Sequence, residues 1–175
     1  MQYTKDDLCC CDIRWYAVDK NGYIFSCTSA GAYNVPKFVC KNREETGLLD
    51  RFFLYSNFNA LDMENKIYME KYMEEETIPQ KIIDALILYE DLTSDDHIIL
   101  ALKGITSFDT LISYCDPKLN EEFKKHPYWC KKLTNPTKLL HFNQLPEDIQ
   151  KIMDSRRMND LDVTKTDYFF VSPPY

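Results

Sequence analysis

The dipeptide Asn21-Gly22 constrains the fold of this chain more than any other feature of the sequence. Asn-Gly between two apolar runs is the typical signal of a two-residue, type I′ β-hairpin, because both central residues of that turn need positive φ, which Gly adopts freely and Asn tolerates. A two-residue loop would place Val18 opposite Phe25. The sequence therefore predicts a hairpin with one apolar, buried face and one half-open face. The predicted buried face holds Tyr16, Val18, Phe25 and Cys27.

Patterns along the rest of the chain alternate between helix and strand. Apolar side chains spaced three and four residues apart, with capping signals, predict helices over residues 43–55, 61–75, 77–89, 116–125 and 145–153. Runs rich in β-formers predict strands over residues 128–133, 138–142 and 168–171, and a helix or strand followed by a strand over 97–108. This order and a length of 175 residues predict a single α+β domain over residues 1–175. We expect a largely antiparallel sheet with helices packed mainly on one face.

Two features argue against a membrane or secreted protein. The longest nearly unbroken apolar run, residues 85–89, is far shorter than the roughly 20 residues that a bilayer span needs. The N-terminal stretch MQYTKDDLCCC carries acidic residues where a signal peptide has a positive end followed by an apolar stretch. We therefore expect a cytoplasmic protein without a membrane partner.

Glycine content and net charge argue against nucleotide-binding and nucleic-acid-binding classes. The chain has only four glycines, and none of them forms a GxGxxG or GxxxxGK phosphate-binding loop. The formal net charge is −7, whereas nucleic-acid binding draws most of its non-specific affinity from the neutralisation of phosphates. We expect no nucleic-acid partner.

The seven cysteines suggest neither a disulfide framework nor a metal motif. An odd number of cysteines in a chain without a secretion signal indicates reduced thiols. Neighbouring side chains of the run Cys9–Cys11 do not converge on a tetrahedral ion, so we predict a strand leading into the hairpin. His126 and Cys130 have the spacing of a helical Cys–His dyad, but Pro127 lies between them and disfavours that helix. We expect no metal and no cofactor, and we assign no catalytic residue.

Acidic residues concentrate in the middle of the chain. Residues 60–100 hold eleven acidic and three basic side chains, so this segment accounts for the negative net charge. Such runs are usually a solvated face or helix-end charges, and they also suit a recognition surface for a basic partner. We predict that six carboxylates at helix ends and in the connecting loop bind a partner: Glu74, Glu75, Glu76, Asp91, Asp95 and Asp96.

Landmarks at both ends of the chain resemble a group of small bacterial proteins. These are the opening WYAVDKNGYIFSCTSAG, the segment KGITSFD, the stretch NPTKLLHFNQLPEDIQKI with its P-x-x-x-L-x-x-x-x-LP pattern, and the final TKTDYFF. The resemblance implies a stand-alone accessory protein, in some cases an immunity partner of a secreted toxin. Its motifs are turn, strand and helix-start signals, and they bring no catalytic residues with them.

Two functional hypotheses follow. The first is a non-enzymatic cytoplasmic binding protein, most concretely an immunity-type inhibitor whose acidic helical surface covers a basic toxin, with exposed tyrosines as anchors. The alternative is a small thiol- or carboxylate-dependent enzyme with a cleft beside the hairpin and loop at residues 15–36. Four residues would line that cleft: Thr28, Ser29, Gly31 and Tyr33. A pocket that holds a titratable group of shifted pKa would favour the enzyme, and an acidic surface would favour the binding protein.

Overall fold

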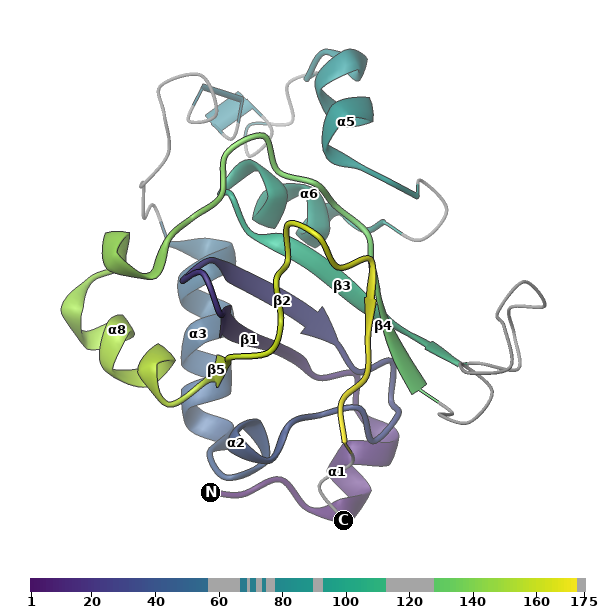
Figure 1. The fold of residues 1–175 in the computed structure, drawn as a ribbon, viewed down its shortest axis with the longest axis vertical. Coiled ribbons are helices and arrows are strands. Elements are labelled where there is room, and N and C mark those ends of the chain that lie inside the picture. The colour runs from purple at the N-terminus through teal and green to yellow at the C-terminus, as the bar shows by residue number, and fades with distance from the viewer. Residues whose placement is uncertain are drawn as a thin grey trace.

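A curled sheet of six strands, in the order β5-β1-β2-β3-β4-β6, forms the centre of the molecule (Figure 1). The computed structural model describes residues 1–56, 67–68, 70–71, 74, 78–89, 93–112 and 128–172. The strands are β1 (Arg14–Asp19), β2 (Ile24–Thr28), β3 (Thr106–Ile112), β4 (Tyr128–Lys132), β5 (Arg157–Met158) and β6 (Tyr168–Phe169). The helices in these ranges are α1 (Lys5–Cys10), α2 (Lys37–Cys40), α3 (Arg43–Tyr55), α5 (Gln80–Leu86), α6 (Asp95–Leu102) and α8 (Glu147–Asp154), with a 3₁₀ helix, η3 (Phe142–Gln144).

The sheet is mixed, so the prediction of a largely antiparallel sheet is wrong. The pairs β1–β2, β3–β4 and β4–β6 are antiparallel, whereas β1–β5 and β2–β3 are parallel. A parallel pair needs a long crossover connection, and here the chain passes through α2, α3, α5 and α6 between β2 and β3. The single α+β domain is confirmed. That the helices pack mainly on one face stays a prediction.

The hairpin of β1 and β2 is confirmed, but its register differs from the predicted one. Val18 lies opposite Ile24, one residue away from the predicted partner Phe25. Because side chains alternate between the two faces of a strand, this shift moves every side chain of β2 to the face opposite to the predicted one. Both faces of the hairpin strands are buried, so the predicted half-open face is also wrong.

The carboxylate of Asp19 explains the register. One of its oxygens accepts the backbone N–H of Asn21 at 2.9 Å and that of Tyr23 at 2.8 Å. The loop therefore spans three residues, 20–22, and among them only Gly22 has positive φ, at +87°. A three-residue loop with its last residue in the left-handed region is the next most common hairpin connection after the two-residue turn.

Two buried clusters lie on the two faces of the central strands. We call the first the aromatic cluster: Trp15, Phe25, Phe108 and Phe169, whose rings meet edge to face at centroid separations between 5.0 and 6.3 Å. Each such ring pair adds about 0.5–1.5 kcal/mol beyond the burial of the side chains. The second cluster joins Tyr16 and Val18 of β1 to Leu49 and Phe53 of α3, Leu100 of α6 and Met153 of α8.

Most local predictions outside the hairpin are confirmed. The helices predicted at 43–55 and 145–153 correspond to α3 and α8, and residues 80–86 of the predicted 77–89 helix form α5. The strands predicted at 128–133 and 168–171 correspond to β4 and β6, and residues 97–108 divide between α6 and β3. Most of the segment 61–75 and all of the segment 116–125 lie outside the described residues.

Two strand predictions are wrong. Cys9 and Cys10 end helix α1, which starts at a capping box in which the Thr4 N–H donates to Asp7 Oδ2 at 2.8 Å and the Asp7 N–H donates to Thr4 Oγ1 at 3.1 Å. This reciprocal pair satisfies two backbone donors at the helix start, and it outweighs the preference of the cysteines for a strand. Residues 138–142 form only one bridge, between His141 and Tyr23, before η3 begins.

Candidate functional site

Exposed apolar side chains gather around α5. Leu88 is 46 % exposed and Tyr89 is 40 % exposed. Beside Leu88 lies a cavity of about 220 Å³, which Ile83 and Asp84 of α5 also line. We call the side chains of Gln80, Ile83, Asp84, Leu88 and Tyr89 the α5 surface. Exposed apolar groups with a polar rim are typical of protein interaction sites.

Backbone pairing holds the α5 surface in place. Pro79 precedes the first residue of α5, and its ring fixes the backbone where the helix begins. The helix ends at Leu86, and the next residue, Ile87, adopts an extended conformation and bridges Thr134. The Leu88 N–H then donates to the Leu133 carbonyl at 2.8 Å. The exposed apolar side chains are therefore anchored to the segment that follows β4.

The six predicted partner-binding carboxylates do not share one environment. Glu74 and Asp95 are exposed. Asp96 instead forms an ion pair inside the molecule, with its Oδ2 2.8 Å from Arg14 Nη2. Asp84, on α5, is a further exposed carboxylate. The remaining three lie outside the described residues: Glu75, Glu76 and Asp91.

Arg14 is the centre of a mostly buried charged cluster, which we call the Arg14 cluster: Arg14, Tyr16, Asp50, Asp96 and His97. Arg14 Nη1 lies 3.5 Å from Asp50 Oδ1, and the Tyr16 hydroxyl donates to the same oxygen at 3.0 Å. Burial disfavours the charge of Arg14, but Tyr16, Asp96 and Asp50 outweigh burial and raise the pKa of the guanidinium. Burial, followed by Asp50, raises the pKa of Tyr16 well above its ordinary value. The cluster joins β1 to α3 and α6.

His97 reaches the Arg14 cluster from α6. Its side chain is 4 % exposed, and Nδ1 accepts the Ser94 N–H at 3.1 Å. The neutral ring therefore carries its proton on Nε2, which has no hydrogen-bond partner among the described residues. Burial, followed by the positive charge of Arg14, lowers the pKa of His97 to about 4. The ring is therefore neutral at pH 7.

Two residues of the predicted cleft are buried and hydrogen-bonded. The Thr28 hydroxyl donates to the carboxylate of Asp109, and burial raises the pKa of Asp109 above its ordinary value. Ser29 Oγ accepts the Ile13 N–H at 2.8 Å. Both hydroxyl groups therefore hold neighbouring segments of the chain together.

The other two residues of the predicted cleft lie in the loop after β2. Gly31 has φ +65°, which closes the turn, and Tyr33 packs partly buried against the face that holds the aromatic cluster. A cavity of about 200 Å³ lies close by, lined by Tyr3, residues 11–14 and the N-terminal half of α3. None of the four predicted residues lines it.

Two buried thiols lie side by side in the core. Cys27 Sγ is 2.9 Å from Cys130 Sγ, and both side chains are fully buried. Burial raises the pKa of Cys27 well above its ordinary value, so the thiol stays protonated and is a poor nucleophile. Cys9, Cys10 and Cys11 are exposed. Within the part of the chain that the structure describes, no group of three or more His, Cys, Asp or Glu side chains is arranged to hold a metal ion.

Sequence reasoning missed the Arg14 cluster, because its members come from three separate segments. One signal was present: an arginine at the start of an otherwise apolar strand needs carboxylates once that strand is buried. The sequence offers 28 acidic side chains as partners. Only the packing of α3 and α6 against β1 selects Asp50 and Asp96.

Comparisons with known proteins found no relative of this chain. No family model, no curated protein and no solved structure matches the chain. Among the residues that the structure describes, no helix is both long enough and apolar enough to cross a bilayer. Fold and site together define a single-domain α+β protein with exposed apolar side chains around α5 and a mostly buried charged cluster around Arg14.

Proposed function

We propose that this chain is a non-enzymatic, cytoplasmic binding protein, and more specifically an immunity-type inhibitor that covers a basic toxin with its α5 surface. One observation carries the proposal. Leu88 and Tyr89 are exposed just after α5, and Leu88 lines the same cavity as Asp84, in the part of the sequence where acidic residues outnumber basic ones by eleven to three.

The chemistry of the α5 surface suits a protein partner. Interfaces combine an apolar centre with a polar rim, and aromatic side chains such as Tyr89 often act as anchors. Lys131 Nζ lies 3.4 Å from the centre of the Tyr89 ring, so one face of the ring is already held in place. A partner that brings basic side chains to Asp84, Glu74 and Asp95 would meet complementary charge.

Charge reversal tests the proposal. A double variant, Glu74→Lys with Asp84→Lys, changes two exposed carboxylates of the acidic segment 60–100, and the matched control is Asp148→Lys with Asp167→Lys, which changes two exposed carboxylates elsewhere. The partner is first captured on the immobilised wild-type protein from the proteins that the same cells secrete, and is then purified. Its association rate is measured with both variants.

We expect the Glu74/Asp84 variant to slow association about tenfold or more at low salt, because complementary charge acts chiefly on encounter. The loss should shrink as ionic strength approaches about 0.15 M, where screening acts within about 8 Å. A partner whose association rate responds equally to both double variants, or to neither, contradicts the proposal.

The second candidate function is a carboxylate-dependent enzyme, and Asp109 is the observation that favours it. Burial raises the pKa of its carboxyl, and the Thr28 hydroxyl donates to it. Such a group would suit proton transfer in a closed cleft. An activity found in the wild-type protein and abolished by Asp109→Asn, with the variant still folded, would favour the enzyme over the binding protein.

A further inference from the structure

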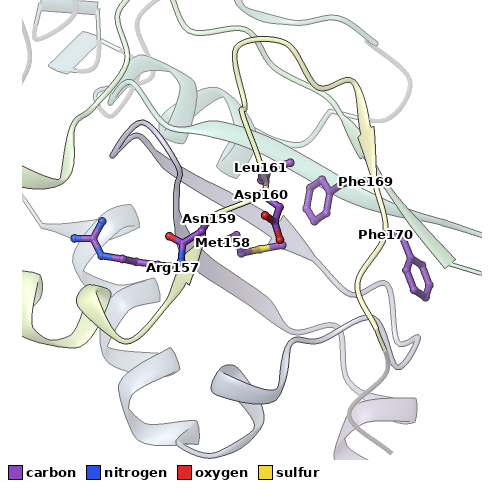
Figure 2. Close-up of a pocket in the computed structure, with 7 residues that line it drawn as sticks. All are labelled: Arg157, Met158, Asn159, Asp160, Leu161, Phe169 and Phe170. Carbon is purple, nitrogen blue, oxygen red and sulfur yellow. The ribbon is translucent and has the colours of Figure 1, made fainter.

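A cavity of about 470 Å³ opens between the two edge strands of the curled sheet, β5 and β6 (Figure 2). Four apolar side chains line it: Met158, Leu161, Phe169 and Phe170. Arg157, Asn159 and Asp160 complete the lining. The volume lies within the range of small-molecule sites, and an apolar lining with a few polar groups is typical of them.

The floor of this cavity is rigid. Phe169 belongs to the aromatic cluster, with its ring centroid 5.0 Å from that of Phe108 and 5.8 Å from that of Phe25. Leu161 is buried, and its backbone carbonyl accepts the Lys20 N–H at 3.0 Å. A ligand therefore meets a preformed apolar surface and does not have to order it first.

The positive group at the cavity is already neutralised. Arg157 donates to Asp154 Oδ1 from Nε at 3.0 Å, and its Nη2 lies 2.9 Å from the same oxygen. Its guanidinium also lies over the ring of Phe142, 4.5 Å from the centroid. Figure 2 shows the Arg157 side chain pointing away from Phe169 and Asp160.

The negative group has no such partner. Asp160 is exposed and makes no ion pair or hydrogen bond with the described residues, and the same holds for the neighbouring amide of Asn159. Figure 2 shows the Phe169 ring turned toward Asp160. The carboxylate of Asp162 is engaged elsewhere, since it accepts the Thr164 hydroxyl at 2.6 Å and pairs with Lys20 at 3.4 Å. The cavity therefore offers a ligand one uncompensated carboxylate beside an apolar floor.

We propose that the pocket between β5 and β6 binds a small organic cation, an amine carried on an aromatic or branched apolar body. The apolar body lies on Phe169 and Met158, and the ammonium group lies at the mouth against Asp160. Thioether and aromatic side chains both favour contact with a ring. This site is separate from the α5 surface, so the inference stands or falls independently of the proposed function.

Three probes that share a phenylethyl body and differ in the charge of its end group test the inference: 2-phenylethylamine, the neutral 2-phenylethanol and the anionic 3-phenylpropanoate. Binding is followed by the NMR shifts of the Met158 and Leu161 methyl groups, because both side chains line this cavity. We expect the amine to bind about two- to fivefold more tightly than the alcohol, as an exposed ion pair allows, and the anion to bind most weakly.

Two variants test whether the Asp160 carboxylate and the mouth of the cavity bind the amine. Asp160→Asn should abolish the preference for the amine, whereas Asp148→Asn, an equal change on α8, should leave it intact. Asn159→Arg should place a tethered guanidinium in the mouth and block the amine, and because residue 159 is exposed the melting temperature should not change. The inference is overturned if the methyl groups do not shift up to about 10 mM amine, or if the three probes bind equally.

Discussion

Replacing His97 with glutamine should remove a loss of stability that the protein suffers on acidification. Glutamine is the matched choice because His97 occupies the third position of α6, where its Nδ1 accepts the Ser94 N–H. A glutamine at that position accepts the same bond from its side-chain oxygen, as in the usual capping box. The variant therefore keeps the helix start and loses only the titrating ring.

The direction of the effect follows from two pKa values. Histidine in an unfolded chain has a pKa of about 6.5. Burial, followed by Arg14, lowers the pKa of native His97 to about 4. Between these values the unfolded chain binds a proton that the native protein does not, so the free energy of unfolding falls as the pH falls. One pKa unit corresponds to about 1.4 kcal/mol, so the loss is about 2 kcal/mol at pH 5 and about 3 kcal/mol near pH 4.

Urea unfolding of both proteins at pH 7 and pH 5 measures the effect. Carboxylates titrate in both proteins and cancel in the difference between them. The stability of His97→Gln relative to wild type should therefore improve by about 2 kcal/mol between the two pH values. A difference that stays constant within about 0.5 kcal/mol would refute the reasoning and would mean that native His97 accepts a proton as readily as an unfolded one.

Two further substitutions, each with a matched control, test the fold. Gly22→Ala should destabilise by about 2 kcal/mol or more, because φ is +87° and the added Cβ would collide with the ring of His141. Gly47→Ala, in α3 and without such a neighbour, should stabilise by up to about 1 kcal/mol, and equal melting temperatures for the two variants would contradict the loop geometry. Lys103→Met should cost about 2–4 kcal/mol in urea unfolding, because the buried Nζ donates to three backbone carbonyls at the end of α3 at distances of 2.6–3.1 Å. Lys151→Met, on the exposed face of α8, should change stability by less than about 0.5 kcal/mol, and a cost as small as this for Lys103→Met would show that the three bonds contribute nothing.

Elements with strong local signals could be predicted from the sequence. Helix α3 begins where the Asn42 side chain accepts the Glu45 N–H at 3.2 Å, and its apolar stripe buries Leu49 and Phe53. Cap and stripe both lie within the segment itself, so neither depends on the rest of the fold. The same reasoning holds for α8, which has a buried stripe of its own.

Features set by distant segments could not be predicted. Cys27 of β2 lies beside Phe108 of β3 in a parallel pair, and nothing near either residue specifies that neighbour. The prediction of the hairpin register was wrong for a different reason. Asn-Gly generally prefers a two-residue turn, but here the carboxylate of Asp19 accepts two backbone N–H groups at the loop and stabilises a three-residue loop. The Arg14 cluster could not be predicted for two reasons. The carboxylates that pair with Arg14 are distant in sequence, and each is one carboxylate among many.

The position of Asp96 shows that the acidic residues of this segment are not equivalent, because some pair inside the molecule and others are exposed. The Asp96 side chain is 39 % exposed and pairs with that of Arg14, which is 16 % exposed, so reversal to Lys would place a second positive charge beside a mostly buried guanidinium. A loss of partner binding in Asp96→Lys would therefore combine a loss of stability with any loss of recognition. Under the proposed function, the exposed carboxylates of Glu74 and Asp84 would act mainly on the rate of association with a basic partner. Under the same proposal Leu88, which is apolar and exposed, would act on the lifetime of the complex, so Leu88→Asp should accelerate dissociation while the charge reversal slows association.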